Sequence, residues 1–232
     1  MHARLRAQAC DGWQSCLSLR LNFRIIQEGL TMPNIDETPP LNAEAFLKVF
    51  LEKYNGKYIE NQDSWEEIWQ DTCKWSKFMI ECVIREVNYP NIRCHNGEPL
   101  RLDAVFTTSP DKWDWFPISI ALEHENNPIG VHGEIKKLIS IDCPLKVMIT
   151  YSLIEEKKIK WVKRKIRESF FEALHRADHL CSRNREYLFI IGDENGHPRE
   201  LSWEYAIFRH NCQEETLHWK NSLDLERLIT KK

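Results

Sequence analysis

The stretch ISIALEHENN, residues 118–127, is the feature that most constrains how this chain folds. It combines the small and apolar residues of a buried strand with two glutamates at its end. Because side chains alternate across a strand, its residues divide between two faces. One face carries Ser119, Ala121, Glu123 and Glu125, and the other carries Ile118, Ile120, Leu122 and His124. The second face is ordinary core, with His124 expected as a satisfied core histidine, whereas the first places two like charges side by side.

Composition indicates a folded protein of the size of one domain. The chain has 232 residues, 42% of them hydrophobic, and nine tryptophans, which is enough for a full core. We predict a poorly ordered N-terminal extension and linker over residues 1–41 and a single domain over residues 42–232. The extension weakly resembles a transit peptide, and Met32 is an alternative start.

The net charge and the cysteine pattern limit which partners and which cellular compartment we expect. The net charge of −3 gives no general attraction to nucleic acid, so any such attraction needs a local patch. The eight cysteines form no CxxC pair, which favours a reducing, cytoplasmic setting. No run of eighteen apolar residues occurs, so we expect no membrane partner.

Local patterns predict an α/β fold with helices flanking a central mixed sheet. A helix is expected from the N-cap Asn42 to the stop Asn55-Gly56, and a second from Ser64, in a capping box with Glu67, to about Val87. Asn96-Gly97 predicts a hairpin whose second strand holds Asp103. A helix over residues 129–141, a strand over 144–151, a basic helix over 153–181, a further strand and a closing hairpin follow. The order is an antiparallel meander joined to one crossover unit.

Three carboxylates are predicted to converge in this sheet. If the two strands pair antiparallel, Asp103 faces the Glu123 end of its neighbour. At about 4 Å and an effective dielectric near 20, each pair of charges repels by about 4 kcal/mol, so the cluster needs a cation or bound protons. Asp103, Glu123 and Glu125 are therefore predicted ligands for Mg²⁺, or Mn²⁺. The alternative is a solvated strand end, with Asp103 in a turn or a salt bridge.

The segments RLDAVF, IALEHEN, GEIKKLISI and PLKVMITY resemble, in order and spacing, the PD-(D/E)XK nuclease superfamily. The resemblance covers roughly residues 67–151. It implies a restriction-endonuclease-like core of helix, three antiparallel strands, helix and strand, which binds magnesium to cut DNA. Asp103 matches the aspartate of the second strand, and Glu123 the first acid of the third.

Glu125 departs from the family pattern, because it stands where the family usually has lysine. Some members with Glu-x-Glu are active, so Glu125 is expected to bind metal or accept a proton. Lys136 or Lys137 on the following helix can supply the missing positive charge if that helix faces the site. Both are otherwise ordinary solvated lysines.

The basic helix is the predicted DNA-binding surface. Its cations would contact phosphates and make affinity depend on salt. They are Lys157, Lys158, Lys160, Lys163, Arg164, Lys165 and Arg167. A solvated helix whose cations pair with its glutamates is an equal alternative. His132, near the start of the preceding helix, is a further phosphate contact to consider.

These observations predict a magnesium-dependent phosphodiester hydrolase acting on DNA. Two rivals stay open. One is a catalytically inactive nuclease-fold domain that binds protein or nucleic acid, and the other is an unrelated α/β interaction domain whose acids are surface residues. The sequence leaves open whether the protein forms a homodimer.

Overall fold

Seven strands of the described residues form one mixed sheet whose spatial order follows the order of the chain. The strands are β1 Arg93–Asn96, β2 Ala104–Thr107, β3 Ile118–Glu125, β4 Leu145–Ser152, β5 Glu186–Asp193, β6 Ser202–Arg209 and β7 Trp219–Asn221. The structure is a computed structural model, and it describes residues 41–89, 91–96, 99–108, 117–152, 156–177, 185–193, 202–209 and 216–222. Residues 1–40 of the predicted N-terminal extension (residues 1–41) and the turn residue Gly97 lie outside these ranges.

The sheet changes from antiparallel to parallel and back again. β1, β2 and β3 pair antiparallel, β3, β4 and β5 pair parallel, and β5, β6 and β7 pair antiparallel. The α/β class and the mixed sheet predicted from the sequence are therefore confirmed. The prediction of one crossover unit was incomplete, because a second helix connects β4 to β5. Every residue of β4 is buried, as expected for a parallel strand covered on both faces.

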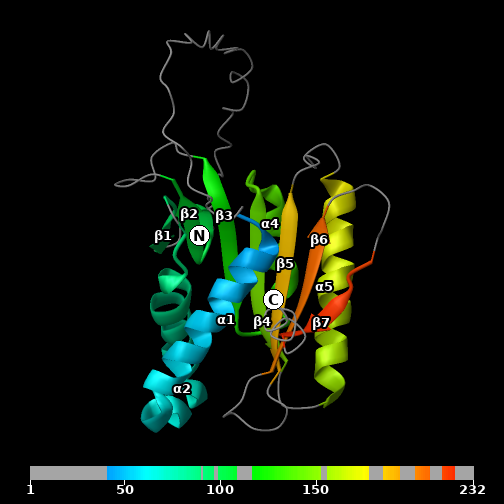
Figure 1. Ribbon diagram of the computed structural model, residues 1–232. Coiled ribbons are helices and arrows are strands. Elements are labelled where there is room, and N and C mark those ends of the chain that lie inside the picture. The colour runs from blue at the N-terminus through cyan, green and yellow to red at the C-terminus, as the bar shows by residue number, and fades with distance from the viewer. Residues whose placement is uncertain are drawn as a thin grey trace, which may run out of the picture. The chain divides into compact units, whose positions relative to one another are not determined.

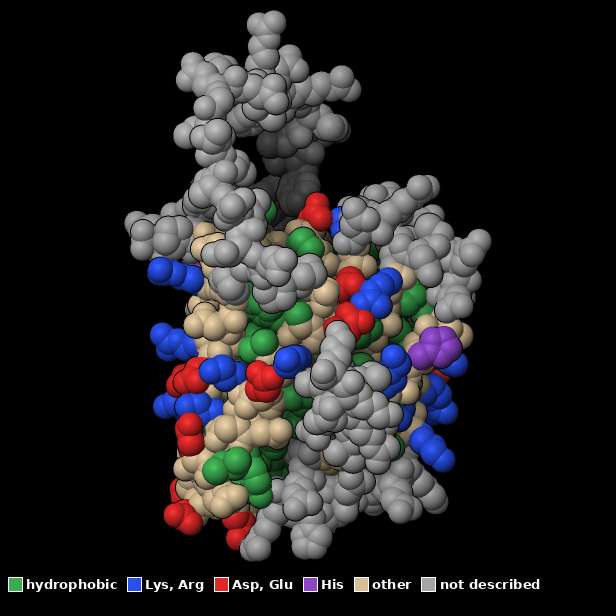
Figure 2. All heavy atoms as spheres, viewed as in Figure 1, with side chains coloured by type: hydrophobic (Ala, Val, Ile, Leu, Met, Phe, Trp, Pro, Cys, Tyr) green, Lys and Arg blue, Asp and Glu red, His purple; other side chains and the backbone are tan. Residues whose placement is uncertain are grey.

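Helices cover both faces of the sheet (Figure 1). The α-helices are α1 Ala43–Glu60, α2 Trp65–Gln70, α3 Thr72–Lys77, α4 Val131–Ser140 and α5 Glu156–Arg176. α1, α2 and α3 contribute to one hydrophobic cluster, and α4 and α5 contribute to a second on the opposite face. Lys and Arg side chains gather along the edge of the molecule that α5 forms (Figure 2). Within the described residues, no helix combines the length and apolar character needed to cross a membrane.

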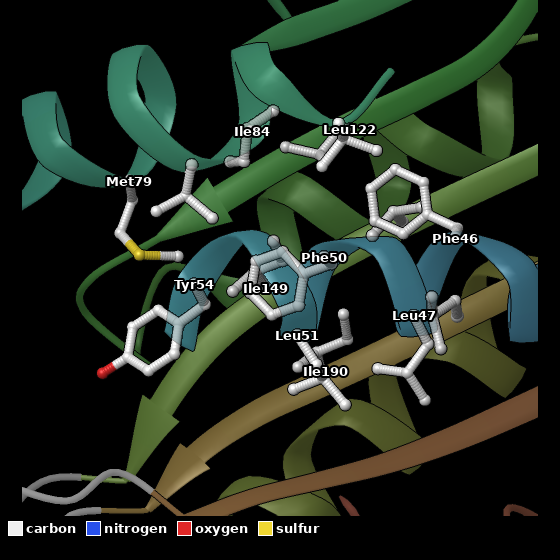
Figure 3. Packing of buried hydrophobic residues seen from close by; sticks show 14 of the residues in the cluster. Phe46, Leu47, Phe50, Leu51, Tyr54, Met79, Ile84, Leu122, Ile149 and Ile190 are labelled. Carbon is white, nitrogen blue, oxygen red and sulfur yellow. The ribbon is translucent and has the colours of Figure 1, made fainter. Parts of the chain in front are cut away.

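One face of α1 packs against the centre of the sheet (Figure 3). Phe46 and Phe50 are fully buried there and approach side chains of β4 and β5 such as Ile149 and Ile190. The ring centroid of Phe50 lies 5.2 Å from that of Trp203 on β6. Burying large aromatic side chains is the main stabilising contribution of such a layer. Phe46 also packs edge-on against Phe106 on β2, so α1 covers the face of the sheet opposite to the candidate site.

The helical region before β1 differs from the predicted two helices. α1 continues through Asn55-Gly56 to Glu60 because Tyr54 and Tyr58 pack edge-on against Trp65, which overrides the local stop signal. The expected helix from Ser64 to Val87 is broken at Asp71, whose carboxylate caps α3 by accepting from Cys73 N at 2.8 Å. A π-helical turn η2 (Phe78–Val83) and a short 3-10 turn η3 (Ile84–Glu86) follow. The Ser64 side chain makes no capping hydrogen bond, so the predicted capping box was wrong.

Two further boundaries move. Asp103 directly precedes β2 rather than lying within it, which leaves its side chain outside the strand ladder. The basic helix, predicted over 153–181, is described from Glu156 to Arg176 as α5 and is followed by a turn at Ala177. Residues 153–155 and 178–181 lie outside the described ranges.

The N-cap of α1 provides a test of this local structure. Asn42 Oδ1 accepts a hydrogen bond from Ala45 N at 2.8 Å. We expect Asn42→Ala to lower the free energy of unfolding by about 1 kcal/mol, measured by urea denaturation. Ser64→Ala is the matched control, because Ser64 caps no helix nitrogen, and its effect should stay within about 0.5 kcal/mol. An equal loss in both variants would contradict the assigned capping roles.

Candidate functional site

The start of β2, the end of β3 and one side of α4 enclose a cavity of about 300 Å³. Ala104 pairs with Leu122 in the antiparallel register, so the preceding Asp103 comes level with Glu123. Glu123 and Glu125 project toward the α4 side of the sheet, as the alternation predicts, while Leu122 packs on the α1 side. The cavity is lined by Arg101, Asp103, Glu123, His124, Glu125, Glu134 and Lys137.

The deepest acid in the cavity is Glu123, whose side chain is only 2% exposed. Its Oε1 atom lies 2.8 Å from the Lys137 ammonium, which comes from α4. The same ammonium donates to the carbonyl oxygen of Arg101 at 2.9 Å and pairs with Glu134 one helical turn earlier. One cation therefore bridges β3, α4 and the segment before β2.

Asp103 is oriented by the backbone of the neighbouring strand. Its Oδ2 atom accepts a hydrogen bond from His124 N at 2.7 Å. The two residues at 100 and 101 both have positive φ, 59° for Leu100 and 61° for Arg101, a conformation that non-glycine residues seldom adopt. This turn delivers Asp103 to the site and aims the Arg101 carbonyl at Lys137.

His124 fixes β3 from the opposite face. Its ring is buried, and Nε2 lies 2.7 Å from the hydroxyl of Tyr151 on β4. Burial lowers the pKa of His124 to about 3, so the ring is neutral at ordinary pH. The prediction of a satisfied core histidine is confirmed. The backbone N–H of the same residue is the group that donates to Asp103.

Glu125 lies at the mouth of the cavity and bonds to the following loop. Its Oε1 atom accepts a hydrogen bond from Asn127 N at 2.7 Å. A Cβ atom at Gly130 would come 2.3 Å from Glu125 Oε2, so the glycine leaves room for this carboxylate. Within the described ranges, no three His, Cys, Asp or Glu side chains lie close enough together to hold a metal ion. The three predicted ligands Asp103, Glu123 and Glu125 all line the cavity, and Glu125 is the one that also bonds to its own loop.

The structure distinguishes between the two candidate lysines and adds an acid that the sequence analysis missed. Lys137 faces the carboxylates, whereas its neighbour Lys136 is exposed to solvent. Glu134 enters the cavity because it lies three residues before Lys137 and so on the same side of α4. That spacing was the available signal, since a helix that presents Lys137 to the site also presents Glu134.

The cavity is strongly anionic despite Lys137. Burial raises the pKa of Asp103, with the His124 N–H opposing the rise. Burial also raises the pKa of Glu123, where Lys137 opposes the shift and nearby Asp103 adds to it. Burial likewise raises the pKa of Glu125. The four carboxylates, the Lys137 ammonium and the Arg101 guanidinium would carry a net charge of −2 if all were ionised, and such a site favours a bound proton or cation.

The basic helix is only partly available for phosphate. Lys163 pairs with Glu204 on β6, and Arg164 lies 3.8 Å from Glu168. The Lys165 ammonium lies 5.7 Å from the centroid of the Trp161 ring. Lys160 and Arg167 are exposed, and the side chains of Lys157 and Lys158 lie outside the described part of the helix.

Comparison with known proteins assigns no family to this fold and site. The sequence matches no protein-family model, and no curated protein matches it significantly. The functional conclusions therefore rest on the residues and their geometry.

The raised pKa of Glu123 predicts how stability changes with pH. In the folded state the pKa of Glu123 is raised from 4.5 to about 9, so its carboxyl keeps its proton between these pH values. In the unfolded chain the same carboxyl loses its proton near pH 4.5. Because the folded state binds more protons in that window, the free energy of unfolding should fall as pH rises, by at most about 1.4 kcal/mol per pH unit for one group. We expect Glu123→Gln to flatten this dependence between pH 5 and 9 in urea denaturation, relative to wild type.

The control for this measurement is Glu81→Gln, an exposed glutamate 3.9 Å from Lys77. It should leave the pH profile unchanged. A wild-type slope that Glu123→Gln leaves unchanged between pH 5 and 9 would show that Glu123 is ionised in both states and that Lys137 keeps it so in the folded state.

Proposed function

We propose that this protein is a divalent-metal-dependent phosphodiester hydrolase that acts on DNA. The observation that carries the proposal is the buried Glu123 carboxylate, level with Asp103 across two paired strands and contacted by Lys137 from the next helix. Burying a charged group is costly unless it is compensated. The arrangement is therefore better explained by a functional role than by chance on a surface.

The order of elements supports a restriction-endonuclease-like core. A helical region precedes three antiparallel strands, β1 to β3, and α4 then leads into β4 parallel to β3. This is the order that the resemblance to the PD-(D/E)XK superfamily implies. On this proposal β5, β6 and β7 extend that core on the side away from the carboxylates.

Asp103 and Glu123 are the residues that would hold the metal. Magnesium in proteins is usually bound by one or two carboxylates, with water and substrate phosphate completing its shell, so two adjacent carboxylates in an anionic cavity fit this ion. When bound, the ion supplies a Lewis acid and a water of lowered pKa.

The remaining side chains have complementary roles on this proposal. Lys137 would donate to the phosphate oxygen on which negative charge accumulates, taking the role that lysine has at the position of Glu125 in the family. Glu125 and Glu134 border the cavity, and the pKa of Glu125 is raised by burial. Glu125 is thus suited to accept the proton from the attacking water.

A catalytically inactive nuclease-fold domain is the second candidate function. The observation that favours it is the Lys137 ammonium, which already pairs with both Glu123 and Glu134. A cluster that its own lysine neutralises can persist without metal. In that case the same fold would serve as a binding module.

The two neighbouring lysines of α4 allow a matched test of catalysis. Cleavage of plasmid and of linear single-stranded DNA should be measured with Mg²⁺ and with Mn²⁺. We expect Lys137→Met to lower the cleavage rate about 100- to 1000-fold, as for loss of one charge-stabilising donor. Lys136→Met should cut like wild type, because its side chain points to solvent. Equal rates for both variants would remove Lys137 from the reaction, and absence of cutting by wild type would favour the inactive module.

Metal binding is tested separately from cleavage. We expect 10 mM Mg²⁺ to raise the thermal unfolding midpoint of wild type, because a ligand that binds only the folded state stabilises it. Asp103→Asn should abolish this rise, since an amide can still accept from His124 N but no longer carries the charge. Glu81→Gln should retain the rise. If Mg²⁺ stabilises Asp103→Asn as much as wild type, Asp103 is not a ligand.

A further inference from the structure

A second cavity lies beside the carboxylate site, between the β3–α4 loop and α5. It measures about 570 Å³, a size that suits a nucleotide-scale ligand. Pro128, Ile129 and His132 form one wall, and α5 forms the other with Trp161, Lys165 and Ser169. We refer to it as the α4–α5 groove.

One short loop separates the groove from the carboxylates. Glu125 bonds to Asn127 N on the cavity side of this loop. Two residues later, Ile129 lines the groove and is 76% exposed, an unusual position for a large apolar side chain in the described chain. A ligand that crosses this loop would therefore contact both places.

The groove combines a stacking surface with a cation. The Lys165 ammonium lies 5.7 Å from the centroid of the Trp161 ring, and Ile129 offers an apolar surface across from α5. Proteins that bind single strands join aromatic side chains, on which bases stack, to cations that contact the phosphates. His132 is held in place, with Nδ1 3.1 Å from the hydroxyl of the buried Ser169.

The charge of α5 suits an anionic ligand. From residue 160 to residue 176 the helix carries six Lys and Arg against two glutamates, a net charge of +4. Both glutamates line the groove, and each has an arginine partner: Glu168 lies 3.8 Å from Arg164, and Glu172 lies 2.9 Å from Arg176. Those acids are thus offset, and they remain able to accept from the amino groups of a base.

We propose that the α4–α5 groove binds an unpaired nucleotide of a DNA strand, next to the phosphodiester that lies at the carboxylates. This inference rests on the proposed function and narrows it to a substrate class. A paired base is stacked on its neighbours and cannot lie against Trp161. Single-stranded DNA, or duplex with an unpaired end or flap, is therefore the substrate class that fits the groove.

The experiment measures binding without cleavage. Fluorescence anisotropy of a labelled 12-nucleotide single strand should be recorded with the full chain in EDTA, and compared with a blunt duplex of the same sequence. We expect wild type to bind the single strand more tightly than the duplex. Trp161→Ala should weaken single-strand binding roughly 5- to 100-fold, the range expected for the loss of one stacked base, and Trp161→Phe should recover most of it.

Matched isoleucines control for general surface effects. Ile129→Ala should weaken binding, whereas Ile59→Ala, which alters an isoleucine 65% exposed on α1, should not. Thermal unfolding midpoints close to wild type show that each variant is folded. Absence of measurable single-strand binding, equal affinity of Trp161→Ala and wild type, or duplex binding as tight as single-strand binding would each overturn the proposal.

Failure of the groove and failure of the proposed function are distinguishable. Metal-dependent cutting together with binding that does not depend on Trp161 would refute the groove alone. Binding that depends on Trp161 without any metal-dependent cutting would refute the hydrolase and leave a single-strand-binding module.

Discussion

The contact between Glu123 and Lys137 is the interaction on which the candidate site depends. The Glu123 side chain is 2% exposed and has lost nearly all of its hydration. The Lys137 ammonium, 2.8 Å away, compensates for part of that lost hydration. Since Lys137 also binds the carbonyl of Arg101, the same contact ties α4 to the turn that delivers Asp103. The cavity therefore assembles only when α4 is correctly positioned over the sheet.

β3 connects this cavity to the main core. Leu122 and His124 point into the aromatic layer under α1, where Tyr151 fixes the histidine ring. Glu123 points the opposite way into the cavity. Because alternate residues of one strand serve both faces, displacement of His124 would move the backbone nitrogen that orients Asp103. The aromatic layer thus helps to position Asp103, which lies on the other side of β3.

The sequence was sufficient for features that depend on strand alternation and neighbouring strands. The face shared by Glu123 and Glu125, the proximity of Asp103 and the core position of His124 all follow from a period of two and antiparallel pairing. Features that depend on the rotation of a helix or on long-range packing were not predictable in this way. The choice of Lys137 over Lys136, the entry of Glu134, the pairing of Lys163 with Glu204 and the continuation of α1 through Asn55-Gly56 each depend on a partner distant in the chain. The bond from Asn127 N to Glu125 was likewise not predictable, because it depends on the conformation of the loop after β3.

The sheet adds its strands in the order of the chain, and this has a consequence for how such a protein can change over time. Strands β5 to β7 extend the sheet beyond β4, on the side away from β1 to β3. The residues around the acidic cavity come from positions 101 to 137, whereas Phe170 on α5 packs against Phe189 on β5 and Phe208 on β6. A lineage that alters β5 or β6 therefore alters the support of α5, and with it one wall of the α4–α5 groove, while β2 and β3 keep their pairing.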